Sequence, residues 1–221
     1  MHSRSIVFAS AAAVCLALSP AAWAGGAFEA SLRTGFTLPL GNVTGPDSNG
    51  KSNSLSDSVT GFIPLWLDLG WRINQNFYLG AYGQLGLGLT KNCPTASCSS
   101  ADLFIGIDGQ YHLLPKESMD PWFGLGLGVE TFGVSTNDNA GHFGTENASG
   151  FQALLQGGLD FKLNNAFHAG PFLSLSFSQY TTLSASENGS GTSTNDIQNT
   201  ALHELFTIGV RGTFDVPSLS N

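Results

Sequence analysis

Ionisable side chains recur on one face of several segments in which apolar residues alternate with polar residues or glycine. The acids on this face are Glu29, Asp68, Asp102, Asp108, Glu130 and Asp160, and the bases are Arg33, Arg72, Lys162 and Arg211. Paired acids can perform general acid–base catalysis when their environments separate their pKa values. Charges in a low-dielectric interior must otherwise be paired with one another. We interpret this set as ion pairs that fill the interior of the folded protein, and we expect no catalytic residue among them.

One interior network is predicted from the heights of these residues above a ring of aromatic residues, described below, at one end of the segments. Its members are Arg33, Asp68, Asp108, Glu130 and Arg211. The planar guanidinium group of an arginine can bind two carboxylates at once, so two arginines can cross-link the walls of a narrow barrel. We expect this network to close the lumen of such a barrel to ions.

The histidines outside the first 24 residues do not form a metal-binding pattern. They are His112, His142, His168 and His203, and no two of them share a strand face at a suitable spacing. His203 and Glu204 are adjacent, so they point to opposite faces of a strand. We therefore expect no metal site and no cofactor.

Eight segments carry the period-two alternation that is typical of β-strands. Their approximate limits are 26–40, 59–73, 77–90, 101–113, 122–134, 150–163, 167–181 and 201–214. Each is longer than the roughly 9–11 residues that a tilted strand needs to cross a bilayer. Together they predict an all-β fold, an eight-stranded antiparallel up-and-down transmembrane β-barrel.

Each segment carries an aromatic residue in its apolar register, at what would be the same end of the barrel. The eight are Phe28, Trp71, Phe77, Tyr111, Phe123, Phe161, Phe167 and Phe214. A ring of aromatics on the apolar face of a sheet is typical of a membrane–water interface. We expect this aromatic girdle to face lipid on the periplasmic side.

Composition and connection lengths favour a barrel whose apolar face is outside. Charged residues make up 11% of the chain, against roughly 25% in soluble domains. The 28 glycines suit the crowded inner face of a narrow barrel. Short turns near 74–76, 114–121 and 164–166 alternate with longer connections at about 41–58, 91–100, 135–149 and 182–200. Short turns on the side of the chain ends and four long external loops are the outer-membrane arrangement.

The first 24 residues have the features of a secretory signal peptide. Arg4 precedes an apolar run, and Ala22 and Ala24 fit the small-x-small rule for cleavage after Ala24. The predicted organisation is a signal peptide at 1–24, a barrel at 25–216 and a short tail at 217–221. Loss of Arg4 changes the formal net charge from −8 to −9. This acidity argues against a nucleic-acid partner.

Two cysteines, Cys93 and Cys98, lie close together in the second long connection. A close pair in an exported chain predicts a disulfide.

The eight-segment pattern, the signal peptide and the loop asymmetry resemble the small outer-membrane barrels of the OmpA, OmpX and opacity-protein class, over residues 25–216. The resemblance implies a location in the bacterial outer membrane. It also implies contact with outer-membrane lipids or lipopolysaccharide and insertion by the outer-membrane assembly machinery. Such chains end on the aromatic that closes the last strand, whereas here Asp215 to Asn221 follow Phe214.

We expect a structural or adhesive role, in which the barrel is an anchor that displays its loops, and we expect it not to be an enzyme. The loop ligand is not specified by the sequence. One alternative is a narrow or lateral passage for small apolar molecules. Another is a lipid A-modifying enzyme, although the His-x-Ser dyad of the deacylases does not occur in the chain after residue 24.

Overall fold

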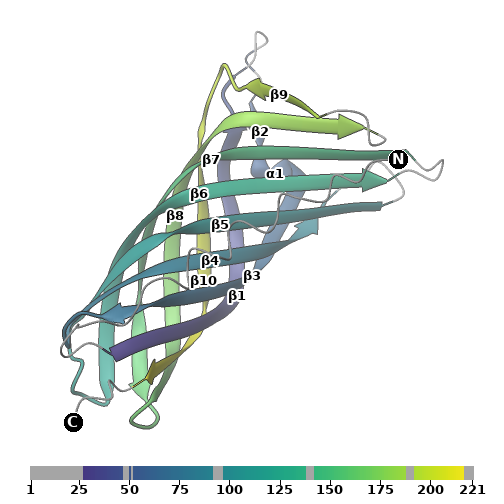
Figure 1. Cartoon of the computed structure of the whole chain (residues 1–221). Coiled ribbons are helices and arrows are strands. Elements are labelled where there is room, and N and C mark those ends of the chain that lie inside the picture. The colour runs from purple at the N-terminus through teal and green to yellow at the C-terminus, as the bar shows by residue number, and fades with distance from the viewer. Residues whose placement is uncertain are drawn as a thin grey trace, which may run out of the picture.

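A closed barrel of eight long antiparallel strands forms the body of the protein (Figure 1). The computed structural model describes residues 27–46, 50, 52–91, 97–137, 142–187 and 192–216. The barrel strands are β1 (Ala27–Thr44), β3 (Val59–Arg72), β4 (Phe77–Thr90), β5 (Ser97–His112), β6 (Met119–Asn137), β7 (Phe143–Lys162), β8 (Phe167–Glu187) and β10 (Leu202–Val216). Each pairs with its neighbour in the chain, and β10 also pairs with β1 to close the barrel. The predicted fold is confirmed.

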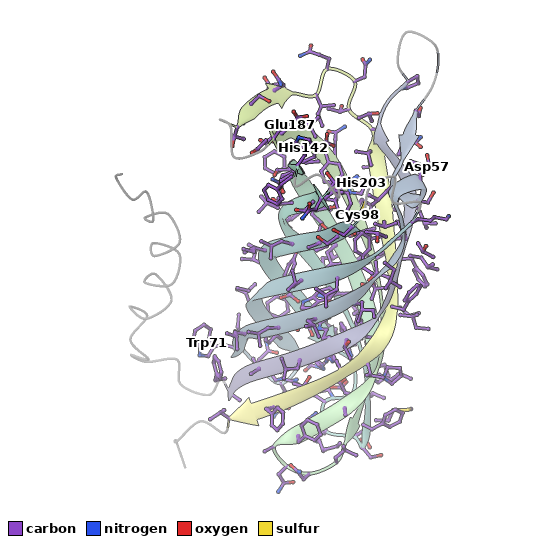
Figure 2. The ribbon with its side chains drawn as sticks, turned by 90° about the vertical axis from the view of Figure 1, so that its right-hand side faces the viewer. Asp57, Trp71, Cys98, His142, Glu187 and His203 are labelled. Atoms are coloured by element: carbon purple, nitrogen blue, oxygen red, sulfur yellow. The ribbon has the colours of Figure 1, made fainter. Side chains whose placement is uncertain are left out.

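Three short elements lie at the end of the barrel opposite Trp71, which we predict to be external and call the external end (Figure 2). The strand β2 (Asn53–Ser54) pairs with β1, and β9 (Ser193–Asp196) pairs with β8. The helix α1 (Leu55–Ser58) begins with a capping box in which Ser54 and Asp57 satisfy each other's backbone N–H groups. Its Leu55 side chain is fully buried. No helix in the described part of the chain is long and apolar enough to span a membrane.

The two faces of the barrel wall differ as the alternation predicts. On β7, Leu154 points inward and is 3% exposed, whereas its neighbour Leu155 points outward and is 49% exposed. On β8, Ser174 and Ser176 are buried in the interior, while Leu173 is exposed on the outside. The outer face is therefore apolar and the inner face carries most of the polar groups, which is the distribution found in membrane barrels.

Several strands continue well past their predicted limits at one end. β6 extends to Asn137, β7 begins at Phe143 and β8 extends to Glu187. The girdle residue Trp71 lies at the opposite end of the barrel from Asp57, His142 and Glu187 (Figure 2). The extensions therefore belong to the external end. They escaped the sequence analysis because polar residues predominate in them, and the few apolar ones, such as Phe143 and Leu183, are too sparse to extend the apolar alternation.

Some predictions concern residues outside the described part of the chain. The signal peptide at 1–24, the tail at 217–221 and Cys93 all fall there. Cleavage after Ala24 and the Cys93–Cys98 disulfide remain predictions.

Candidate functional site: the barrel interior

The centre of the interior holds two almost completely buried arginines. Arg33 on β1 and Arg211 on β10 are each 2% exposed. Arg33 donates from Nε and Nη2 to the two carboxylate oxygens of Asp68, both at 2.7 Å. Arg211 donates from Nε to Asp160 Oδ1 at 2.8 Å and from Nη2 to Asp160 Oδ2. Each guanidinium therefore has a bidentate carboxylate partner, the geometry of strong charge-assisted hydrogen bonds.

Two glutamines join these ion pairs through a third acid. Arg33 Nη1 donates to Gln156 Oε1 at 2.5 Å, and Gln156 Nε2 donates to Asp108 Oδ2 at 2.7 Å. Arg211 Nη1 donates to Gln110 Oε1 at 2.7 Å, and Gln110 Nε2 donates to the same Asp108 oxygen at 2.8 Å. A continuous chain of hydrogen bonds therefore runs from one arginine to the other by way of Asp108.

Aromatic rings pack against both guanidinium groups. The Cζ atom of Arg211 lies 3.7 Å from the centre of the Trp122 ring, and that of Arg33 lies 5.4 Å from it. Arg33 Cζ also lies 4.6 Å from the Trp66 ring and 5.4 Å from the Phe172 ring. Cation–π contacts of this kind gain strength when water is excluded.

All eight barrel strands contribute to this group of side chains, which we call the central layer. Its members are Arg33 from β1, Trp66 and Asp68 from β3, Tyr82 from β4, Asp108 and Gln110 from β5, Trp122 from β6, Gln156 and Asp160 from β7, Phe172 from β8 and Arg211 from β10. Tyr82 packs on Trp66 with the ring centres 5.7 Å apart, and its hydroxyl donates to Gln152 on β7 at 2.7 Å. The layer spans the lumen from wall to wall.

The composition of the layer differs from the predicted network in part. The structure brings Arg33 together with Asp68, and it links both arginines to Asp108 through glutamines. Asp160, which we placed on the inner face but not in the network, is the direct partner of Arg211. The two glutamines were also missed. Their position on the inner face of the alternation was the available signal, but their partners depend on which strands face each other across the lumen.

Glu130 lies in a second cluster nearer the external end, and its predicted grouping with the arginines is corrected. Its Oε1 accepts hydrogen bonds from the Tyr180 hydroxyl and from His203 Nε2, the latter at 2.9 Å. The rings of Tyr180 and His203 stack with their centres 4.2 Å apart. A buried histidine and tyrosine therefore bind one oxygen of this carboxylate in place of an arginine, while its Oε2 has no partner among the described residues. In the described residues, both carboxylate oxygens of the nearby inward acid Asp102 have no hydrogen-bond partner.

A third group of charges surrounds the girdle end of the lumen. Arg72 donates from Nε and Nη2 to Glu29 Oε2 at 3.0 and 2.7 Å. His112 Nδ1 lies 2.7 Å from Asp120 Oδ2, and the His112 ring stacks on Trp122. Across the described ranges, no group of three or more His, Cys, Asp or Glu side chains is arranged to hold a metal ion.

The eight predicted girdle aromatics all lie in described strands, in the outward register. Six of them are exposed and two, Phe28 and Phe167, are half-buried. Neighbouring rings contact each other in three pairs, which are Phe28 with Trp71 at 5.6 Å, Tyr111 with Phe123 at 5.7 Å and Phe167 with Phe214 at 4.5 Å between ring centres. Their depth in a membrane stays a prediction.

Several solved structures of outer-membrane proteins have a fold similar to that of this chain. A major outer membrane protein from Thermus thermophilus is similar to this chain with a TM-score of 0.57 and 9% sequence identity, over 87% of this chain and 100% of that one. The chain has the fold of a small outer-membrane β-barrel. No protein-family model matches the sequence, and no curated protein matches it either.

Other outer-membrane barrels are similar at lower scores. Neisserial surface protein A has a TM-score of 0.47 and 13% identity, over 85% of this chain and 96% of that one. The outer membrane protein OprG from Pseudomonas aeruginosa has a TM-score of 0.47 and 17% identity, over 88% of this chain and 99% of that one. At these identities the likeness concerns the fold alone.

Proposed function

We propose that this protein is a closed barrel of the outer membrane, which conducts no steady ion current and serves as a rigid anchor for an external display surface. The observation that carries the proposal is the central layer, because it places two paired arginines and four aromatic rings across the lumen. In an eight-stranded barrel the inward side chains are enough to fill the interior.

The charges of the layer oppose ion passage in two ways. Both arginines are held bidentately by acids, so neither is free to bind a passing anion. The acids Asp68 and Asp160 are 1% exposed and are engaged by those arginines. Among the described residues, Asp108 Oδ1 is the one carboxylate oxygen of the layer without a hydrogen-bond partner. An ion that entered would therefore lose its hydration for few compensating contacts, which is a large barrier in a low-dielectric interior.

The display surface is formed by the external ends of the longest strands. β6, β7 and β8 contain 19, 20 and 21 residues, roughly twice the 9–11 that cross a bilayer. Their outer parts remain paired as far as Asn137 with Phe143 and Gly144 with Glu187. Residues Ser97–Ser100 of β5 extend this sheet on one side and β9 extends it on the other. A continuous sheet is more rigid than separate loops, and this rigidity suits adhesion, since little entropy is lost when a partner binds.

Planar-bilayer recording tests the closed lumen. We expect the wild type to show no steady conductance, and Arg33→Ala and Arg211→Ala to show discrete openings, because each removes a guanidinium from the layer. Lys91→Ala, which removes an exposed lysine at the external end of the barrel, is the control and should behave as wild type. Steady conductance of the wild type at the level of both arginine variants would contradict the proposal.

Labelling of intact cells tests the display surface. We expect a cysteine at Thr194, an exposed residue of β9, to react with a maleimide that cannot cross the membrane. A cysteine at Asn165, in the turn between β7 and β8, should react only after the outer membrane is permeabilised. The reverse pattern would show that the external and periplasmic ends have been exchanged.

A further inference from the structure

Two acidic side chains face each other across the seam where the barrel closes, at its girdle end. Glu29 on β1 and Asp215 on β10 are direct register partners. The Cβ atoms of directly opposite strand residues lie about 4.5–5.5 Å apart. Glu29 is 1% exposed, and the side chain of Asp215 is 18% exposed. Two charged carboxylates at such positions repel each other, and burial strengthens the repulsion.

Each acid has one oxygen engaged by a basic side chain. Arg72 on β3 donates to Glu29 Oε2 from both Nε and Nη2. On the other side of the seam, His168 Nε2 on β8 lies 3.4 Å from Asp215 Oδ2. The second oxygens, Glu29 Oε1 and Asp215 Oδ1, are buried and have no hydrogen-bond partner among the described residues. The two unpartnered oxygens therefore belong to the two residues that are directly opposite each other.

A proton is the one group small enough for these two oxygens. Both are shielded from solvent, so a larger ligand would have to displace the barrel wall. A proton between them makes one acid a donor and the other an acceptor, and it removes one of two like charges. Asp215 follows the girdle residue Phe214 and lies beyond the predicted membrane-spanning part of β10. Burial and the neighbouring Glu29 carboxylate raise the pKa of Asp215 above its ordinary value, while Arg72 and His168 oppose this shift.

Other ionisable groups at this end of the lumen do not supply the missing hydrogen bonds. They are Arg211 on β10, Asp160 and Lys162 on β7, His112 on β5, Asp120 on β6 and Lys116 in the turn after β5. Arg211 is held by Asp160, and His112 is held by Asp120. The Lys162 ammonium donates to the carbonyl oxygen of Pro115. The nearby cations favour one negative charge on the pair of acids, but within the described ranges none of them donates to either unpartnered oxygen.

We propose that Glu29 and Asp215 share one proton, which stabilises the girdle end of the closing seam. In the unfolded chain the two acids titrate independently. Pairing of β1 with β10 brings them together, so closure of the barrel takes up a proton from solvent. The stabilisation is complete below the ordinary pKa of aspartate and is lost as the pH rises through the raised pKa of the pair. Above that range both acids are charged, and their repulsion loosens the end of β10 from the start of β1. This inference is independent of the closed lumen and of the display surface proposed above.

Urea titration of the full barrel in lipid vesicles, repeated over a range of pH, tests the shared proton. We expect the unfolding equilibrium constant of the wild type to increase by up to about tenfold per pH unit while the proton is lost. Asp215→Asn should not show this increase, because its amide N–H donates to Glu29 Oε1 at every pH. Asp196→Asn, on the exposed strand β9, is the matched control and should follow the wild type. Only barrels that migrate as folded on unheated gels are compared.

Hydrogen exchange locates the effect at the seam. At one alkaline pH, we expect the amides of residues 27–33 on β1 to exchange faster in the wild type than in Asp215→Asn. The variant His168→Gln removes the other titrating neighbour of Asp215 and should keep the pH dependence of the wild type. A pH dependence that is unchanged in Asp215→Asn would overturn the proposal. A pH dependence that disappears in His168→Gln would assign the titration to the histidine and overturn it as well.

Discussion

Arg33 and Arg211 lie directly opposite each other on β1 and β10, at the seam where the barrel closes. Like charges in such a cross-strand pair are destabilising on their own. Here each guanidinium turns to a different wall, Arg33 to Asp68 on β3 and Arg211 to Asp160 on β7. The Trp122 ring lies close to both cations. The closing seam is therefore held by two separate ion pairs.

Removing one acid from this arrangement should destabilise the barrel strongly. Asp160→Asn leaves Arg211 without its carboxylate partner at a site that is 1% exposed. We expect a loss on the order of 3–5 kcal/mol in the free energy of unfolding, as for other broken buried pairs. Urea titration of the barrel in lipid vesicles measures it. Asp196→Asn on the exposed strand β9 is the control, and an equal effect of both changes would refute a dry, paired interior.

Tryptophan fluorescence can place the aromatic girdle, because only one of the three described tryptophans faces outward. Trp71 is 45% exposed, whereas Trp66 and Trp122 are each 3% exposed inside the lumen. Lipids brominated near the headgroup should quench the wild type, and Trp71→Phe should remove most of that quenching. Quenching that persists undiminished in Trp71→Phe would show that the register of the girdle is incorrect.

Close approach of neighbouring strands leaves little room for a side chain at Gly170. A Cβ atom at Gly170 would lie 1.7 Å from the carbonyl oxygen of Leu159, whereas at Gly83 the nearest atom would be 3.9 Å away. Gly170→Ala must displace the β7 backbone, so we expect slower folding and a lower urea midpoint. Gly83→Ala should match the wild type. Similar urea midpoints for the two variants would indicate that β7 and β8 are farther apart than described.

The predicted disulfide between Cys93 and Cys98 should form after export. Closing so small a loop should stabilise the folded state by about 2 kcal/mol in the chain-entropy model. Its main effect would be on the shape of the loop around Pro94. Mass spectrometry of the exported protein, with and without reduction before alkylation, measures the pairing. Two alkylated thiols in the unreduced sample would exclude it.

The sequence alone determined the number of strands in the barrel wall, their direction and which face of each is apolar, but not the short strands β2 and β9. Period-two alternation is a local property of the sequence. In a run such as Leu125, Leu127 and Val129, which alternate with three glycines, the apolar side chains share one face of the strand, and in a narrow barrel the glycines take the inner face. The girdle positions follow in the same way from the apolar register. The external extensions of β7 and β8 could not be predicted, because polar residues such as Asn147 and Ser184 interrupt the apolar alternation there.

Only the tertiary structure decided which interior side chains meet. Arg211 binds Asp160 rather than Asp68, and Glu130 binds His203 rather than an arginine. Position along a strand gives a residue's approximate height, but partners across the lumen depend on the tilt and stagger of all eight strands together. Long side chains such as arginine and glutamine add several ångströms of reach. The sequence pattern therefore restricts the set of possible partners across the lumen but does not identify which two residues pair.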